Sequence, residues 1–180
     1  MDANLLSRRT FLAFTSIAAG GIGPAMAETK SNTPPPADFP QLEFVYEATV
    51  AIAPLEDVGE VSSGRQRIIP ITGGTFEGPN IRGKVIPGAA DWNLIRNDGV
   101  TVVSASYFLR TDDGVYIKIV NQGVNPSLPP GAAPPSRPRF TIPSFEAPKG
   151  HYDWLNKSVF VGTLAPGAPG SVRIRVFKLI

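Results

Sequence analysis

The side chains available for chemistry in this 180-residue sequence are carboxylates, phenols, hydroxyls, amides and guanidinium groups. There is no cysteine, and His151 is the one histidine. Thiolate nucleophiles, disulfides and most cysteine or histidine metal sites are therefore excluded. Gly73-Gly74 and Gly78 form no phosphate loop, because the Gly-Lys-Ser/Thr ending and the following helix are missing. We expect no metal and no cofactor.

Three residues are candidates for acid–base catalysis: Asp91, Glu77 and Tyr107. A carboxylate that faces an apolar interior has a raised pKa and can exchange protons near neutral pH. Asp91 or Glu77 would act as the base and Tyr107 as the acid. Each residue also has a structural alternative. Asp91 can cap a turn, Glu77 can lie exposed beside a turn, and Tyr107 can be a core residue.

Five further residues are predicted to bind a ligand: Trp92, Asn121, Trp154, Asn156 and Arg67. The two tryptophans and Asn156, together with Asp91, are expected to form a rim of indole, amide and carboxylate groups. Arg67 would pair with a ligand carboxylate. Such aromatic walls with few polar groups suit a small aromatic or polyketide-like ligand. The alternatives are core or mouth tryptophans, an amide that satisfies turn backbone, and an arginine on the outer face.

Strand periodicity indicates which of these side chains point inward. In residues 101–111, Tyr107 shares a face with Val103, Ala105 and Leu109, so we expect that face to line the interior. In residues 115–122, Asn121 shares a face with two isoleucines. Asp112-Asp113-Gly114 is expected to join the two segments as a hairpin.

The whole pattern is one of short strands with almost no helix. Strands are expected at residues 42–52, 65–71, 80–87, 91–96, 101–111, 115–122, 139–145, 158–164 and 172–179. Gly73-Gly74 is expected to end the second strand, and residues 152–157 to form a helical turn. This spacing is typical of an antiparallel barrel or sandwich. We favour an all-β, single antiparallel barrel, because closure at about eight strands removes exposed edges and leaves a cavity.

The N-terminal residues predict export. Ser7-Arg8-Arg9-Thr10-Phe11-Leu12 is a twin-arginine pattern, and Ala25-Met26-Ala27 is a signal-peptidase pattern. A membrane anchor is the alternative, but the intervening stretch of about 16 residues is shorter than the ~20 apolar residues of a spanning helix. We therefore expect a signal peptide at residues 1–27 that engages the twin-arginine translocase and signal peptidase. The protein would have no stable membrane span and would be periplasmic or otherwise exported.

Two proline-rich segments frame the predicted domain. Residues 28–40 are typical of a linker, which leaves a barrel domain at residues 41–180. Residues 124–138 are expected to form a long loop of the lid or binding type. The 17 basic and 15 acidic residues are scattered, so nucleic acid is not an expected partner. No feature indicates an oligomeric state.

Several sequence blocks, in order, resemble a known family. The blocks are IPITGGTFEGP (residues 69–79), RGKVIPG (82–88), ADW (90–92), YFLRTDDG (107–114), NQG (121–123), YDWLN (152–156) and FVG (160–162). They resemble the bacterial and fungal family known as domain of unknown function 3237 over essentially the whole domain. The resemblance implies a small antiparallel β-barrel of lipocalin-like shape and no agreed activity. The export signal and the long proline-rich loop depart from the family pattern.

These residues leave two main functions open. The first is an exported barrel that binds a small apolar or aromatic molecule in its interior. The second is a cofactor-independent lyase, isomerase or cyclase that acts on a small aromatic or polyketide-like substrate by carboxylate and tyrosine chemistry, worth ~10²–10⁴-fold per proton transfer. A structural envelope protein, which would have no enclosed cavity, is a third.

Overall fold

A computed structural model describes residues 38–126 and 138–180. The predicted signal peptide at residues 1–27, the predicted linker up to residue 37 and most of the predicted proline-rich loop lie outside these described residues. Within the described residues, no helix is long and apolar enough to cross a membrane.

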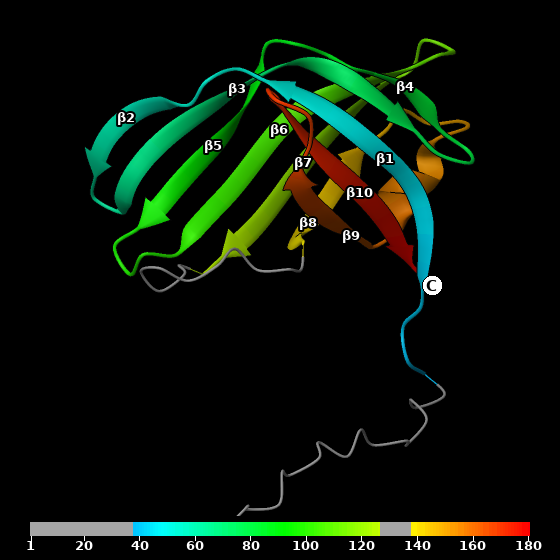
Figure 1. The fold of residues 1–180 in the computed structure, drawn as a ribbon. Helices are drawn as coiled ribbons and strands as arrows, with labels where there is room; N and C mark the ends of the chain where they lie inside the picture. Colours follow the sequence, from blue (N-terminus) through cyan, green and yellow to red (C-terminus); the bar gives the residue numbers. More distant parts are fainter. Residues whose placement is uncertain (1–37, 127–137) are drawn as a thin grey trace, which may run out of the picture. The chain divides into compact units, whose positions relative to one another are not determined.

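The described chain consists of strands joined by short turns, with one short 3-10 helix (Figure 1). In chain order the elements are β1 (Leu42–Ile52), β2 (Glu56–Val61), β3 (Gly64–Glu77), β4 (Arg82–Val85), β5 (Ala89–Arg96), β6 (Thr101–Thr111), β7 (Tyr116–Asn125), β8 (Arg139–Glu146), η1 (Asp153–Lys157), β9 (Phe160–Pro166) and β10 (Ser171–Leu179). The expected all-β class is confirmed.

The strands form one antiparallel sheet that closes on itself. The order of neighbours is β1-β10-β9-β8-β7-β6-β4-β3, and β1 also pairs with β3, which closes the ring. The strands β4 and β5 occupy one position in succession, because both lie between β3 and β6. The ring thus has eight strand positions. This confirms the predicted antiparallel barrel of about eight strands.

Side chains alternate between the interior and the surface along the barrel strands, as a period of two requires. On β6, Tyr107 and Leu109 are buried, whereas Phe108 between them is exposed. On β7, Asn121 is buried on the same face as Ile117 and Ile119. The expected inward faces of these two strands are therefore confirmed.

Two strands differ from the expectation. The strand β3 does not end at Gly73-Gly74 but continues to Glu77. Both glycines adopt positive φ values, 135° and 138°, and the pairing with β1 continues through them with a register shift beside Gly73. The strand β2 was not expected, since it is acidic and mostly exposed. Its ladder with β3 and the ion pairs of Arg65 with Asp57 and Glu60 hold it in place.

Two local features also correct the expected boundaries. A bulge in β1 shifts the register against β10 between Phe44 and Tyr46. As a result Val45 and Tyr46 are both buried, and Phe44 does not share the inward face of Tyr46. The strand β7 continues to Asn125, so it includes the first residues of the predicted proline-rich loop.

One end of the barrel interior is packed with aromatic rings. Tyr46 contacts Phe76 and Phe145, and Phe145 contacts Phe160, all edge to face, with ring centroids 5.4, 6.3 and 4.9 Å apart. The helix η1 adds Leu155, which is almost fully buried, to the same cluster. These residues come from the start of β1, the end of β3, the end of β8 and the start of β9. The opposite ends of the same strands carry smaller side chains and leave space between them.

Candidate active site

A cavity of about 140 Å³ lies at the less densely packed end of the barrel. Apolar side chains from β1, β3, β6, β9 and β10 form most of its wall: Val50, Ile52, Ile69, Ile71, Val103, Ala105, Leu164, Val172 and Ile174. Six polar or charged side chains complete the wall: Asp91, Asn93, Tyr107, Asn121, Arg139 and Thr141. An apolar cavity with a few convergent polar groups is the usual form of a small-molecule site.

Three of these polar side chains are buried without a partner. The Tyr107 hydroxyl, the Asn121 Oδ1 and the Thr141 hydroxyl have no hydrogen bond within the described residues. Each residue is only 2–3% exposed. An unsatisfied buried polar atom costs about 1–3 kcal/mol, so its presence calls for an explanation. A molecule bound in the cavity would supply the missing hydrogen bonds.

Asp91 brings a carboxylate into the same cavity from β5. The backbone N–H of Ser104 on β6 donates a hydrogen bond of 2.7 Å to Asp91 Oδ1. Burial raises the pKa of the Asp91 carboxyl above its ordinary value of 3.8, while the Ser104 N–H, the Asn93 side chain and the charge of Arg67 act in the opposite direction. The carboxyl is thus fixed in position and holds a proton more readily than an exposed aspartate.

Asn93 is held by Arg67 and in turn contacts Asp91. The Arg67 Nε donates to Asn93 Oδ1 at 2.9 Å, and its Nη2 donates to the same oxygen. The Asn93 side chain hydrogen-bonds to the Asp91 carboxylate. Arg67 was expected to bind a ligand directly, but it does not line the cavity. Its observed contact positions Asn93, and through Asn93 it orients the carboxylate.

Tyr107 provides a neutral hydroxyl. Burial raises the pKa of its phenol well above the ordinary value of 10.0, so the group stays protonated over the whole physiological range. The pKa of the neighbouring Tyr46 phenol is raised as well, first by burial and then by Tyr107. Tyr46 is not part of the cavity wall. Tyr107 is therefore the phenol that a bound molecule would meet.

Replacing Tyr107 by Phe is expected to stabilise the unliganded protein by about 1 kcal/mol, because it removes a buried hydroxyl without a partner. Urea unfolding of both proteins measures this difference. Tyr152→Phe is the matched control, because the Tyr152 hydroxyl donates to Asp113 Oδ1 at 3.1 Å, and its loss should destabilise the protein. A Tyr107→Phe variant as unstable as the Tyr152→Phe control would contradict the assignment of an unpaired hydroxyl.

Three of the predicted site residues lie away from the cavity. Trp92 is 52% exposed on the outer surface, because it follows the inward-facing Asp91 in the same strand. Glu77 is exposed at the end of β3 and borders a separate surface depression. Asn156 donates to the Ala147 carbonyl and accepts from the Ala147 N–H, both at 2.8 Å. Asn156 thus fixes the turn before η1, as the structural alternative had it.

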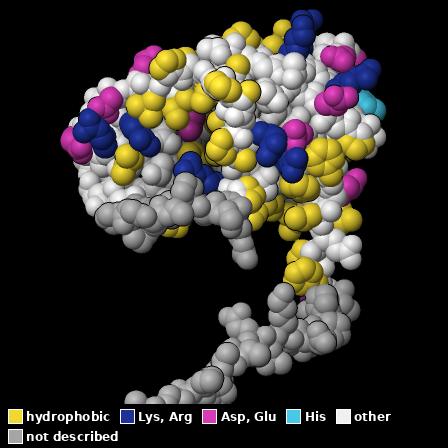
Figure 2. All heavy atoms as spheres, in the orientation of Figure 1, with side chains coloured by type: hydrophobic (Ala, Val, Ile, Leu, Met, Phe, Trp, Pro, Cys, Tyr) yellow, Lys and Arg dark blue, Asp and Glu magenta, His cyan; other side chains and the backbone are white. Residues whose placement is uncertain are grey.

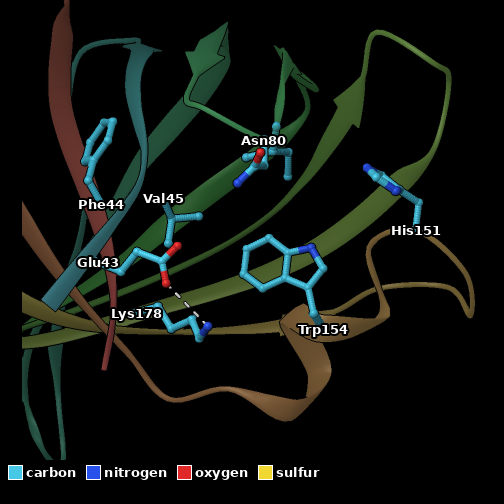
Figure 3. A pocket seen from close by; sticks show the side chains of 8 residues that line it. Glu43, Phe44, Val45, Asn80, His151, Trp154 and Lys178 are labelled. Atoms are coloured by element: carbon cyan, nitrogen blue, oxygen red, sulfur yellow. Dashed lines mark hydrogen bonds and ion pairs between the residues drawn. The ribbon is translucent and has the colours of Figure 1, made fainter. Parts of the chain in front are cut away.

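Trp154 lies in a different hollow, a groove of about 370 Å³ at the packed end of the barrel. Figure 3 shows its indole directed into this groove, with His151 on the loop beyond it. The ion pair between Glu43 and Lys178, with Nζ and Oε2 3.4 Å apart, lies beside it. The groove is lined by the start of β1 and the end of β10, whereas the cavity is lined by the end of β1 and the start of β10. The predicted rim of tryptophans and Asn156 around Asp91 is therefore not formed.

Three polar or charged cavity residues were not singled out from the sequence: Asn93, Thr141 and Arg139. Asn93 is two residues after Asp91 and therefore faces the same way. Arg139 and Thr141 share the inward face of β8 in the same manner. The period of two was thus an available signal for all three. Within residues 38–126 and 138–180, no cluster of three or more His, Cys, Asp or Glu side chains is arranged to hold a metal ion.

The described barrel resembles known proteins in both sequence and structure. Residues 40–179 match the sequence model of a family described as "Protein of unknown function (DUF3237)". A "UPF0311 protein" from Rhodopseudomonas palustris (strain TIE-1) is 34% identical over 136 residues, which cover 69% of this chain and 88% of the relative. The "Hydroalkoxylation enzyme phnH" from Penicillium herquei is 27% identical over 124 residues, which cover 69% and 74%. A crystal structure of a beta-barrel like protein from Acinetobacter baumannii AYE matches with a TM-score of 0.67 at 30% identity, over 83% of this chain and 99% of that chain.

Proposed function

The chain belongs to the DUF3237 family of proteins of unknown function, and from its own cavity we propose what it does. A small, largely apolar molecule binds inside the barrel, and Asp91 transfers a proton on it while Tyr107 stabilises the developing negative charge. The chain would thus be a cofactor-independent lyase or isomerase. If the molecule is bound but not converted, the chain is a binding protein for it.

One observation carries this proposal: a carboxyl with a raised pKa and a neutral, unpartnered phenol line the same small cavity. A carboxyl fixed by Ser104 and Asn93 can accept a proton without moving. A carboxylate whose pKa lies closer to neutral pH is a stronger base, so it takes up a proton more readily and can still return it near that pH. Titratable side chains with shifted pKa values are frequent at functional sites. Here two side chains with raised pKa values, Asp91 and Tyr107, both line the cavity.

The raised pKa of Tyr107 favours one role over another. A phenol with a raised pKa does not readily transfer its proton to another atom. It can still donate a hydrogen bond to an oxygen that becomes negative during the reaction. In the addition of a hydroxyl to an alkene conjugated to a carbonyl group, Asp91 would remove the hydroxyl proton as the new C–O bond forms and the C=C π electrons move towards the carbonyl oxygen. Tyr107 would stabilise the resulting enolate oxygen, and Asp91 would return its proton to the enolate carbon. No atom is gained or lost, and the reverse direction is an elimination.

The name of the Penicillium herquei relative supports this class of reaction. Hydroalkoxylation is the addition of an alcohol O–H across a carbon–carbon double bond. Such a step needs a base for the hydroxyl and a proton for the carbon, which is what a single fixed carboxyl can supply in turn. The identity of 27% between the two chains supports the class of reaction only. The substrate of this chain has to be inferred from its own cavity.

The test is to identify a retained metabolite and follow its fate. The purified protein is incubated with a metabolite extract, and retained molecules are released and identified by mass spectrometry. Each is then incubated with fresh protein and monitored by NMR. We expect conversion, either to an isomer of the same mass or to two elimination products. A retained molecule that stays unchanged would contradict catalysis and leave the binding function, while retention of nothing would contradict both.

A further inference from the structure

We propose that the substrate of this cavity is a single-ring, hydroxylated anion, a class for which 4-hydroxybenzoate is a non-reacting binding probe. Its anionic group would pair with Arg139, and its hydroxyl would donate to Asn121. This inference rests on the proposed function for the location of the site, and it goes further by naming the ligand class. Size, charge and unpaired hydrogen-bonding atoms support it separately.

The size of the cavity limits the buried part of the ligand to about one ring. The cavity volume is about 140 Å³. An apolar cavity of ~150 Å³ in an engineered protein binds benzene, whereas pockets for larger, drug-sized ligands measure ~300–1,000 Å³. Polycyclic molecules would therefore have to leave most of their surface outside. A six-membered ring with small substituents fits the space available.

Arg139 supplies the positive charge for an anion. It begins β8, lines the cavity and is itself exposed, so it lies at the mouth. Several other cations of the barrel pair with a carboxylate on a neighbouring strand, such as Arg65 with Asp57 and Arg175 with Glu47, and acidic and basic side chains are interspersed on the face drawn in Figure 2. No ion pair joins Arg139 to a carboxylate within the described residues. Its planar guanidinium is thus free to bind a ligand carboxylate through two parallel hydrogen bonds.

Arg67 does not compete for this role, and Asp91 does not neutralise Arg139. The Arg67 guanidinium is bound to Asn93 Oδ1. The charge that acts on the Asp91 carboxyl is that of Arg67, and no hydrogen bond or ion pair joins Asp91 to Arg139. Arg139 is therefore the cation that an incoming anion meets at the cavity.

The unpaired atoms deeper in the cavity specify a hydroxyl. Asn121 Oδ1 is an acceptor, so only a donor on the ligand can satisfy it. The hydroxyls of Tyr107 and Thr141 can each donate or accept. A ligand hydroxyl can donate to Asn121 Oδ1 and accept a hydrogen bond from one of the protein hydroxyls at the same time. A ring with a hydroxyl at one end and an anion at the other matches this arrangement.

A series of three probes on the wild-type protein tests the class directly. The probes are 4-hydroxybenzoate, its neutral amide 4-hydroxybenzamide, and benzoate, which lacks the hydroxyl. Isothermal titration calorimetry measures each affinity. We expect 4-hydroxybenzoate to bind about tenfold or more tightly than either of the others, since each loses one hydrogen-bonded contact to a charged or buried group. Equal affinities for the acid and the amide, or no binding of 4-hydroxybenzoate, would overturn the proposal.

Two variants test which residue causes each of the two binding preferences. Arg139→Gln should abolish the preference for the acid over the amide, and Asn121→Leu should abolish the preference for 4-hydroxybenzoate over benzoate. Arg173→Gln is the matched control, because Arg173 is an exposed arginine on β10 whose side chain does not line the cavity, and it should behave as wild type. An Arg139→Gln variant that keeps the acid preference would overturn the assignment. Thermal melting confirms that each variant is folded, and the probe series on the wild type does not depend on any variant.

The failure of this inference can be told apart from failure of the proposed function. If the probe series shows the expected preferences but no retained metabolite is converted, the ligand class holds and the catalytic proposal fails. If a neutral or polycyclic metabolite is retained and converted, the catalytic proposal holds and the ligand class fails.

Discussion

Asp91→Asn is expected to lower turnover of the retained metabolite by about 10²–10⁴-fold, the usual contribution of a positioned general base, with little change in the dissociation constant. The amide has the shape of the carboxyl and can still accept the hydrogen bond from the Ser104 N–H. It cannot take up a proton, so the loss should fall on kcat. Single-turnover rates and calorimetric affinities, measured on both proteins, separate the two quantities.

The pH profile of the wild type gives the same prediction a second readout. A base acts only when ionised, so kcat should rise as the pH rises through the pKa of Asp91 in the folded protein. Burial places this pKa above the ordinary 3.8, so the rising limb should lie above that value and be absent from Asp91→Asn. Asp112→Asn is the control, because Asp112 is an exposed carboxylate in the turn after β6, outside the cavity. Equal loss of turnover in both variants, or an unchanged profile in Asp91→Asn, would remove Asp91 from the reaction.

The part of the site that can be predicted from the sequence is the part that follows from the alternation of side chains along a strand. The inward positions of Tyr107 and Asn121 follow from alternation along β6 and β7, because the pleat leaves each side chain only two directions. The same rule shows why Asp91 and Trp92 cannot both face the cavity, a conflict within the expected rim. Asn93 was equally accessible to this rule, since it lies two positions after Asp91.

Other placements depend on contacts between distant segments. Trp154 belongs to η1, and only the closed topology shows that η1 lies at the packed end rather than at the cavity. Arg139 and Thr141 share an inward face that is readable on β8, but which end of the barrel they line depends on the stagger of eight strand positions. The alternation along one strand predicts whether a side chain points into the barrel or outward. The register between strands decides at which end of the barrel that side chain lies.

Gly73-Gly74 shows the same limit for the fold. A glycine pair is typical of a strand end, and the sequence carries nothing that distinguishes an end from a bend. In the structure the two glycines have nearly the same φ but different surroundings. A Cβ on Gly73 would meet only Val85 O, at 3.7 Å, whereas a Cβ on Gly74 would lie 2.1 Å from Thr49 O and 3.0 Å from Val50 Cα. Gly74 is therefore a position at which the backbone of β1 leaves no room for a side chain on β3.

Replacing Gly74 by Ala is expected to destabilise the protein by more than about 4 kcal/mol, a loss characteristic of a severe steric conflict. The new methyl group would overlap backbone of β1, and backbone cannot rotate away as a side chain can. The strands would have to separate where Val50 pairs with Gly74. This pairing closes the barrel, and Val50 is also part of the cavity wall, so any surviving fold should have lost ligand affinity as well. Urea unfolding and calorimetric titration measure the two effects.

Gly73→Ala is the matched control for this prediction. Its φ of 135° is nearly that of Gly74, so an alanine there carries a similar backbone strain, about 1–3 kcal/mol. It adds no close contact, because the nearest atom is at ordinary van der Waals distance. The difference in unfolding free energy between the two variants therefore measures the steric conflict with β1, separately from the cost of a positive φ. If both alanines cost the same, strain alone would account for the glycine pair, and closure between β1 and β3 would not depend on the missing side chain.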